Sequence, residues 1–432
     1  MARLPGPRPG LTDLGVLPGG DRMRPLIIGG GPAGTAAAIT LAERGVPARL
    51  IDRRDPRAPD GRVCGGLLTP RAVRLLDALG IDARPLGRSI DSIDLMARGR
   101  QQRIAWPTSI DTGSNAGIVL PRDRLDAALL ARAGELGVDV ELGREALEPV
   151  IERGFVRGVR TVAASHEMTE PADLVLVADG ANSTFGRALG TSRRQDWPYV
   201  SALRVVLHGT TTDRTNVEFH FDLERGPGDG LPGFGWVFPG DDDTVNIGVQ
   251  VSSTARDATA VNLHALLEQL IERVADRWGV AEDPAEAAER AEGARTPVGD
   301  SIVPVAGPNF LVAGDAAGHA NPLTGAGIEA ALRLGIEAGE VMTAATRTAP
   351  DALQGFVPRV RAIHADHHKT GRQIVRLTGR PFGSRLLATI ATKSWGAPTV
   401  MRFALAEFRS SGGAAETLHS VTKLLGRVAP EA

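Results

Sequence analysis

The stretch Leu26-Ile-Ile-Gly29-Gly-Gly31-Pro-Ala-Gly34 joins a short apolar run to glycines with the spacing G-x-G-x-x-G. Such an apolar run is typical of a buried parallel strand. Glycines at this spacing let the backbone turn tightly, approach a pyrophosphate and pack a helix against the strand. The N–H groups that open such a helix face the phosphates. The stretch therefore predicts a dinucleotide site that uses Gly29, Gly31 and Gly34.

The residues that follow complete a strand–helix–strand unit. Thr35–Arg44 has the composition of a helix and is followed by Gly45, and Ala48–Ile51 is typical of the next strand. Asp52 stands at the end of that strand, about 20 residues beyond the glycines, where an acidic side chain accepts hydrogen bonds from ribose hydroxyls. We include the neighbouring Arg53 in the predicted cofactor site. Both NAD and FAD bind to this unit, so it does not choose between them.

A second acidic residue at a strand end favours FAD. The apolar stretch Asn309–Ala313 predicts another strand, and Gly314-Asp315 follows it directly. A carboxylate at that point can hold the ribityl chain, which FAD has and NAD lacks. The helix predicted over Ile328–Leu334 opens with unpaired N–H groups, which would stabilise the negative charge of a reduced flavin ring. The cofactor contacts predicted in this region are Gly314, Asp315, Pro322, Gly325 and Gly327.

Length and composition limit the class of protein. The chain has 432 residues, which is enough for two or three domains. Its net charge of −2 gives no global field that would attract nucleic acid. Cys64 is the only cysteine, so no intrachain disulfide can form, and a reducing, cytoplasmic compartment is expected. Residues 1–23 are rich in proline and glycine without a continuous apolar core, so we expect a disordered extension and no signal peptide.

The order of elements predicts a doubly wound α/β FAD-binding domain with an inserted antiparallel-sheet substrate domain and a helical C-terminal region. Ile90–Trp106 and Tyr199–Val251 show the two-residue alternation and the β-forming residues of such a sheet. Asn262–Gly279 has the apolar spacing of a helix. The expected divisions are an FAD-binding domain of residues 24–85, 116–196 and 295–347, a substrate domain of residues 86–115 and 197–294, and a helical region of residues 348–432.

Three further stretches carry a family resemblance. They are Val63–Pro70 with its Cys64-Gly65-Gly66, Ala178–Ser183 with Asp179 and the nearby Arg187, and Leu231–Pro239. Together with the two glycine segments they resemble the geranylgeranyl reductase family of FAD oxidoreductases, which includes the menaquinone side-chain reductases. That family lies within the wider para-hydroxybenzoate-hydroxylase-like group of flavoproteins. The nucleotide motifs are shared with hydroxylases, whereas the Cys-Gly-Gly and aromatic stretches are more specific.

The aromatic stretch departs from the family pattern P-x-x-Y-x-W-x-F-P at two positions. Leu231 replaces the first proline, and Phe234 replaces the tyrosine, whose hydroxyl could serve as a polar anchor or proton relay. On a strand, Phe234, Trp236 and Phe238 face one side. The resemblance implies that they line an apolar substrate cavity against the flavin. The more common use of alternating aromatics is core packing, which stays open as the alternative.

The residues expected near the flavin each have an alternative role. The resemblance implies that Cys64 and Gly65 lie beside the ring, where Cys64 could gate the site or deliver a proton; a small buried hydrophobe is the other interpretation. It also implies that Asp179 is a second cofactor contact. Arg122 precedes a helix and could reach the pyrophosphate through paired hydrogen bonds, with Arg124 as its rival.

Histidines are further candidates for a proton donor. His319 lies in the predicted flavin loop, and His208 and His220 lie in the predicted substrate sheet. A lone histidine is more often structural than catalytic. We name Cys64 and His319 as the candidate catalytic residues.

These features predict an FAD-dependent reductase of C=C bonds in an isoprenoid, such as a polyprenyl or quinone side chain, or in a related apolar substrate. An FAD-dependent monooxygenase would use the same cofactor motifs and is the alternative. A flavin-dependent halogenase is disfavoured because those enzymes need a lysine in the N-terminal half, and none precedes Lys369 here. The external electron donor, NAD(P)H or a ferredoxin-like protein, and the oligomeric state stay open.

Substrates of this kind reside in membranes, so we expect the otherwise cytoplasmic enzyme to touch the inner membrane face peripherally. The candidate surface lies among basic residues of the C-terminal region and contains Phe382, Leu386, Leu387, Ile390 and Trp395. Packing against the body of the protein is the more common use of such residues, and we prefer it. We predict no nucleic-acid partner and no metal site.

Overall fold

The computed structural model describes residues 23–55, 63–106, 116–347 and 350–405. The extension predicted for residues 1–23 therefore lies almost entirely outside the described residues. The last part of the predicted C-terminal region, residues 406–432, lies outside them as well.

Five parallel strands form the sheet that carries the glycine motif, in the order β20-β12-β1-β2-β8. The strands are β1 Pro25–Ile28, β2 Arg49–Asp52, β8 Asp139–Leu142, β12 Leu174–Val177 and β20 Phe310–Val312. The central strands β1 and β12 are buried along their whole length. Their continuous apolar sequences are those of strands covered on both faces.

Helices cover one face of this sheet, and a small antiparallel sheet covers the other. The helices are α1 Pro32–Glu43, α3 Arg122–Glu135 and α7 Ile328–Arg347, which share one apolar core with the sheet. The opposite cover consists of β9 Arg144–Glu152, β10 Phe155–Ala163, β11 His166–Pro171 and the short α4 Thr184–Ala188. Small residues allow α1 and α7 to touch, since a Cβ on Gly335 would lie 2.3 Å from the Ala33 carbonyl oxygen.

A seven-stranded sheet forms the second half of the molecule, in the order β18-β14-β17-β16-β15-β5-β6. Its strands are β5 Ser92–Ala97, β6 Arg100–Ala105, β14 Tyr199–His208, β15 Asn216–His220, β16 Gly233–Pro239, β17 Thr244–Ser252 and β18 Glu292–Pro297. The predicted antiparallel sheet is present with one exception, because β15 pairs with β5 in parallel. These two strands come from the separate early and late segments of the sheet.

One face of the seven-stranded sheet is covered by α5 Leu263–Trp278 and α6 Pro284–Glu289. The helix predicted over Asn262–Gly279 is thus confirmed, and its ends follow from local chemistry. The Asn262 side chain accepts from the Ala265 N–H, and Gly279 ends the helix with a positive φ of 61°.

Shorter elements lie between these strands and helices along the chain. They are β3 Leu67–Leu68, α2 Pro70–Ala78, η1 Arg84–Leu86, β4 Arg88–Ile90, β7 Gly117–Val119, β13 Ser192–Arg193, η2 Ala258–Ala260, β19 Ile302–Val303, η3 Gly314–Ala317 and η4 Pro350–Gly355. The C-terminal helices are α8 Phe356–Thr378, α9 Pro381–Ala391 and α10 Ala397–Ala404. Within the described ranges, no helix is both long and apolar enough to span a bilayer.

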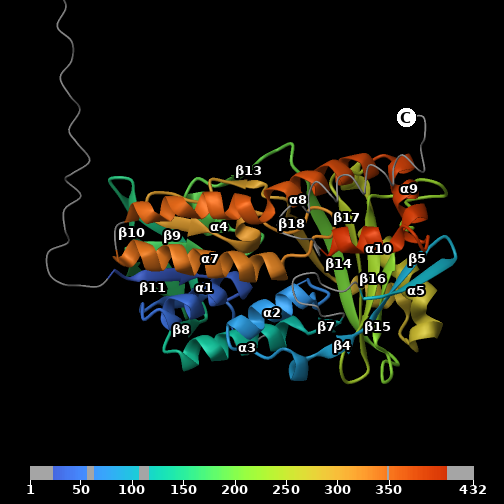
Figure 1. Ribbon diagram of the computed structural model, residues 1–432, viewed down its shortest axis with the longest axis horizontal. Helices are drawn as coiled ribbons and strands as arrows, with labels where there is room; N and C mark the ends of the chain where they lie inside the picture. Colours follow the sequence, from blue (N-terminus) through green and yellow to red (C-terminus); the bar gives the residue numbers. More distant parts are fainter. Residues whose placement is uncertain (1–22, 56–62, 107–115, 348–349, 406–432) are drawn as a thin grey trace, which may run out of the picture.

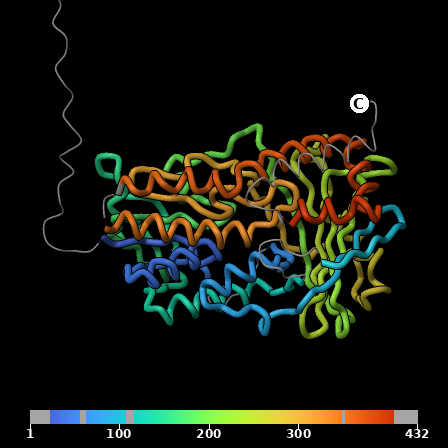
Figure 2. The backbone as a smooth tube through the Cα atoms, viewed as in Figure 1, coloured from blue at the N-terminus to red at the C-terminus, as the bar shows by residue number. Residues whose placement is uncertain are grey.

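The two halves lie at opposite ends of an elongated molecule (Figure 1). The parallel sheet with α1 and α7 forms one end, and the seven-stranded sheet with α5 forms the other. The backbone colours in Figure 2 show that early and late segments of the chain meet in both ends. The first half therefore combines strands that are distant in sequence, as the order of the nucleotide motifs predicts.

Candidate active site

The first glycine turn has no room for side chains. Gly29 has a φ of 108°, and a Cβ there would lie 2.2 Å from the Ala178 carbonyl oxygen. A Cβ on Gly34 would lie 1.9 Å from the Gly29 carbonyl oxygen. Gly31 stands at the N-cap of α1 and supplies no side-chain cap, so the first N–H groups of the helix stay available for an anion.

Asp52 at the end of β2 is held by the same turn. Its Oδ2 accepts from the Gly30 N–H at 2.5 Å, and its Oδ1 accepts from the Arg54 N–H at 2.7 Å. Arg54 also donates to the Gly30 carbonyl oxygen at 3.1 Å. The Arg53 side chain is 65% exposed and lies 3.9 Å from Glu145. The structure therefore turns Arg54 toward the glycine turn. The charge of Arg53 acts on Asp179, and the predicted contact of Arg53 with the cofactor stays a prediction.

Asp179 and Asp315 offer carboxylate oxygens at the ends of the next two strands. Among the described residues, the buried Oδ1 of Asp179 has no hydrogen-bond partner. Burial raises the pKa of Asp179 above its ordinary value. Burial likewise raises the pKa of Asp315, while the charge of Arg122 opposes that rise. An unpaired buried acceptor costs about 1–3 kcal/mol, which a ligand hydroxyl would offset.

The structure separates the two arginine candidates. Arg122 binds Asp126 at 3.1 Å, and its Nη2 would be 4.0 Å from a Cβ on Gly31. Arg124 is turned outward instead and pairs with Asp241 at 2.5 Å. Of these two candidates, Arg122 is therefore the one beside the glycine turn. Arg187 is exposed on α4, and its predicted contact with the cofactor stays a prediction.

The Cys-Gly-Gly loop packs edge-on against the aromatic strand β16. A Cβ on Gly65 would lie 2.6 Å from the Phe238 ring, so only glycine lets the loop come this close. Trp236 Nε1 donates to Asn246 Oδ1 at 2.9 Å, and Asn246 Nδ2 donates to the Cys64 carbonyl oxygen at 2.9 Å. These contacts fix the loop and the indole relative to each other.

One apolar cavity of about 220 Å³ joins the predicted cofactor turns to the aromatic strand. This is far more than the roughly 15 Å³ that one buried water needs. Cys64, Gly65 and the turn Asn321–Gly327 contribute to its lining. Its aromatic wall, which includes the three predicted residues, consists of Phe219, Phe221, Phe234, Trp236 and Phe238. The cavity is open between the cofactor turns and this wall, so the aromatics do more than fill a core.

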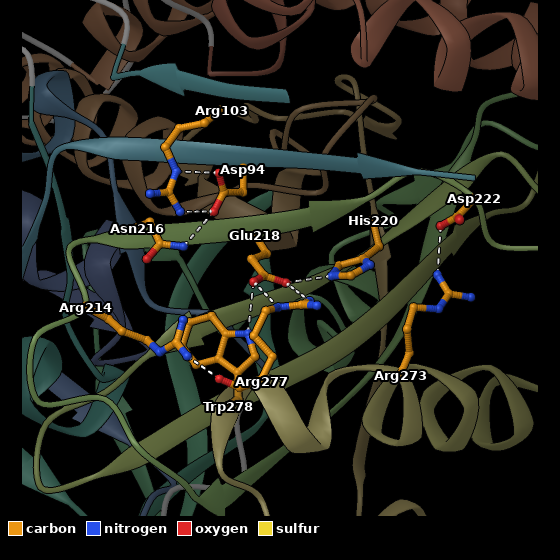
Figure 3. A network of polar contacts seen from close by, with 10 residues as sticks. All are labelled: Asp94, Arg103, Arg214, Asn216, Glu218, His220, Asp222, Arg273, Arg277 and Trp278. Atoms are coloured by element: carbon orange, nitrogen blue, oxygen red, sulfur yellow. Dashed lines mark hydrogen bonds and ion pairs between the residues drawn. The ribbon is translucent and has the colours of Figure 1, made fainter. Parts of the chain in front are cut away.

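The histidines predicted from sequence do not line this cavity. His319 is 1% exposed and lies 3.9 Å from Asp300, one layer behind the lining. His220 faces away from the cavity, because its strand neighbours Phe219 and Phe221 line it and strand side chains alternate. His220 binds Glu218 at 3.0 Å instead (Figure 3). His208 is exposed on β14.

Other polar residues of the lining were missed from the sequence. His364, His367 and His368 on α8 line the cavity, and Asp300 lies against His368 at 2.9 Å. The spacing H-x-x-H-H within a helical stretch was the available signal, because residues three and four apart share a helix face. In the parts of the chain that the structure describes, no cluster has the makeup of a metal site.

Comparisons with known proteins agree with this geometry. The FAD binding domain family matches residues 22–355. Menaquinone reductase from Mycolicibacterium smegmatis is 32% identical over 371 residues, which cover 85% of this chain and 88% of that protein. The chain belongs to the geranylgeranyl reductase family of FAD-dependent oxidoreductases.

Two further matches extend this result. Digeranylgeranylglycerophospholipid reductase 1 from Methanopyrus kandleri is 28% identical over 365 residues, covering 82% of this chain and 89% of that protein. A geranylgeranyl bacteriochlorophyll reductase-like protein from Thermoplasma acidophilum has a TM-score of 0.72 at 21% identity, covering 93% of this flavoprotein and 99% of that chain. The last match shows the shared fold.

FAD is the cofactor of this flavoprotein, and the residues present fit it. The glycine turn has space only for backbone, the start of α1 is uncapped, and Asp179 Oδ1 has no partner in the described ranges. Each feature matches a part of FAD, since phosphates accept from N–H groups and sugar hydroxyls donate to carboxylates. The predicted doubly wound fold and the predicted cofactor are both confirmed.

Proposed function

We propose that this flavoprotein reduces C=C bonds in the isoprenoid chain of a quinone or a related lipid. The supporting observation is the single apolar cavity shared by the cofactor turns and the aromatic wall. A long hydrocarbon chain is held by buried area and shape, because it offers no hydrogen bonds. The family relatives named menaquinone reductase and digeranylgeranylglycerophospholipid reductase support the same substrate class.

The proposed cofactor site spans the three motifs. Reduced FAD, when bound, supplies a hydride. The N–H groups of α1 and the Arg122 guanidinium would hold its phosphates, and the three strand-end carboxylates would hold its hydroxyls. The residues proposed to contact FAD are Gly29, Gly31, Gly34, Asp52, Arg53, Cys64, Gly65, Arg122, Asp179, Gly314, Asp315, Pro322, Gly325 and Gly327. We assign residues 24–85, 116–196 and 295–347 to the FAD-binding domain. Residues 86–115 and 197–294 are assigned to the substrate-binding domain.

The residues of the chain itself position the substrate and exclude water. Phe234, Trp236 and Phe238 would hold the alkene against the cofactor, and the Cys64–Gly66 loop closes the space beside it. A dry cavity suits proton and hydride transfer to an unactivated alkene, because water would compete for the proton.

Anaerobic reoxidation of the reduced protein tests this function. We expect menaquinone with an unsaturated side chain to reoxidise the reduced flavoprotein and to gain two hydrogens in its side chain, as measured by mass spectrometry. The same quinone with a saturated side chain is the control, because electrons could also pass to the quinone ring. Reoxidation only after air is admitted, with oxygen incorporated into the product, would instead identify a monooxygenase.

We also propose that the protein works in the cytoplasm at the inner face of the membrane and reaches its substrate through α9 and the turn that follows it. Phe382 is 69% exposed and Trp395 is 43% exposed, whereas Ile390 is buried. The predicted surface therefore divides into a packed part and an exposed part. Exposed aromatic side chains next to basic residues such as Arg380 suit an anionic bilayer.

Vesicle flotation tests the membrane contact. We expect binding to vesicles of anionic phosphatidylglycerol to fall roughly tenfold for the double variant Phe382→Ser/Trp395→Ser, because two apolar anchors are lost. Ile151→Ser is the matched control, since Ile151 is 51% exposed on β9 in the other half of the molecule. Equal binding of the double variant and the wild type would exclude α9 and the following turn as the contact surface.

A further inference from the structure

A cluster of buried imidazoles surrounds one carboxylate beside the cavity. Asp300 Oδ2 lies 2.9 Å from His368 Nδ1, and Asp300 Oδ1 lies 3.9 Å from His319 Nε2. The His364 ring stacks on the His368 ring with centroids 5.0 Å apart and an interplanar angle of 7°. The cluster joins the turn after β18, the end of η3 and one face of α8. The cofactor motifs do not account for it.

The cluster is both buried and open to the cavity. His368 is 2% exposed and His364 is 7% exposed, yet both line the cavity that holds the aromatic wall. The Nε2 atom of His364 has no hydrogen-bond partner among the residues that the structure describes. Polar atoms left without partners in an apolar cavity are costly, so they point to a ligand or a reaction.

The surroundings of the cluster keep three of its four imidazoles neutral. Burial holds the pKa of His364 well below its ordinary value, and it brings the pKa of His319 to about 4 and that of His367 to about 3. Burial alone would raise the pKa of Asp300, but the nearby His368 ring holds it well below its ordinary range. Asp300 is therefore ionised at pH 7, and the ring closest to it is His368, with Nδ1 2.9 Å from Oδ2.

Two cations face the cluster from outside it. Arg71 on α2 acts on His367 and lies 3.8 Å from Glu329, and Arg372 on α8 acts on Asp300. The charge of Arg71 lowers the pKa of His367 further, beyond the effect of burial and of His368. The rings of His319, His364 and His367 are therefore neutral at pH 7, and His368 is the ring that lies nearest the Asp300 carboxylate.

We propose that His368, positioned by Asp300, donates the proton in the reduction of the substrate C=C bond. This proposal rests on the proposed reductase function. The hydride forms one new C–H bond, the π bond breaks, and its electron pair takes the proton of His368 to form the second C–H bond. The alkene gains two electrons and two hydrogens, and His368 regains a proton from water after the product leaves.

Asp300 acts as a positioning residue in this scheme. A carboxylate bonded to one ring nitrogen fixes the tautomer and orientation of an imidazole and stabilises its charged form. Phe234 lacks the hydroxyl that the family tyrosine could use as a proton relay. With His368 as the donor, the proton source lies on α8 and not on the aromatic strand.

The charge on His368 can be measured without turnover. We expect ring-labelled histidine NMR of the FAD-loaded protein to show one cationic buried imidazole at pH 7, whose signal is absent in His368→Gln. In Asp300→Asn the same ring should be neutral at pH 7, because its carboxylate partner is gone. A neutral His368 in the wild type overturns the proposal, whether or not the reductase function holds.

Kinetics test the role of the proton. We expect His368→Gln to slow alkene-dependent reoxidation by roughly 100-fold or more while its FAD content stays normal. Asp300→Asn should move the basic limb of the pH–rate profile to lower pH. His264→Gln, exposed on α5, is the matched control and should behave like the wild type. If wild-type protein reduces the alkene and His368→Gln keeps its rate and pH profile, the proposal is wrong and the function stands.

Discussion

Replacing Gly34 by alanine should give a protein that purifies without FAD. The added Cβ would lie 1.9 Å from the carbonyl oxygen of Gly29 and 3.1 Å from its carbonyl carbon. Both are backbone atoms, so the clash cannot be relieved by rotating a side chain. The turn must open, and the N–H groups of α1 then no longer converge on the phosphates. We expect FAD affinity to fall at least roughly 100-fold, which is about 3 kcal/mol.

Gly134→Ala provides the matched control for this prediction. Gly134 also lies within a helix, α3, but a Cβ there has no atom within 4 Å among its neighbours. Alanine at such a site should stabilise the protein by roughly 0.5–1 kcal/mol and leave FAD binding unchanged. Titration of apoprotein with FAD, followed by flavin fluorescence, measures both affinities. Wild-type affinity in Gly34→Ala would falsify the assigned role of the turn.

The features that sequence predicted well are local ones. The β1–α1–β2 unit follows from an apolar run, glycine spacing and an acidic strand end, all within one short stretch. The bounds of α5 follow from its apolar spacing and from the capping chemistry of Asn262 and Gly279. Interactions between residues that are close in the sequence determine such elements, so one sequence is enough to locate them.

The features that sequence missed depend on packing between distant segments. Arg54 was not singled out, because only the path of the chain after β2 brings its side chain to the Gly30 carbonyl oxygen. The parallel pairing of β15 with β5 joins two segments that the sequence separates widely. Asp300 meets His368 because α8 returns across the turn after β18. No local pattern encodes these encounters.

The aromatic wall depends on a second polar network behind it, which leads to the last prediction. Glu218 is 2% exposed on β15, next to Phe219, which lines the cavity. Its carboxylate accepts from His220 at 3.0 Å, from Arg277 at 2.7 and 2.9 Å, and from Trp278 Nε1 at 3.0 Å (Figure 3). These bonds tie β15 to the last turn of α5.

Because of this network, the free energy of unfolding of the protein depends on pH in the acid range. Burial alone would raise the pKa of Glu218, but the hydrogen bonds and charges of His220 and Arg277 lower it to about 2. An unfolded glutamate has a pKa of about 4.3. Because the folded value is the lower one, the contribution of Glu218 is complete above about pH 5 and disappears as the pH falls toward 2. The contribution of Glu218 to the free energy of unfolding is roughly 3 kcal/mol, since each pKa unit corresponds to about 1.4 kcal/mol.

Glu218→Gln should therefore unfold more easily at neutral pH and lose part of its acid sensitivity. We expect its free energy of unfolding in urea to fall by roughly 2–4 kcal/mol at pH 7, because the amide cannot accept all the bonds that the carboxylate accepts. The difference from wild type should shrink steadily between pH 5 and pH 2.

Glu148→Gln is the matched control for Glu218→Gln. Glu148 pairs with Arg160 on the surface, where their side chains are 55% and 44% exposed, and such a pair contributes less than about 1 kcal/mol. If Glu218→Gln and the wild type lost stability in parallel from pH 7 to pH 3, the carboxylate would not be the acid-sensitive group behind the aromatic wall. The sensitivity would then belong to other carboxylates, and the wall would owe its position to apolar packing alone.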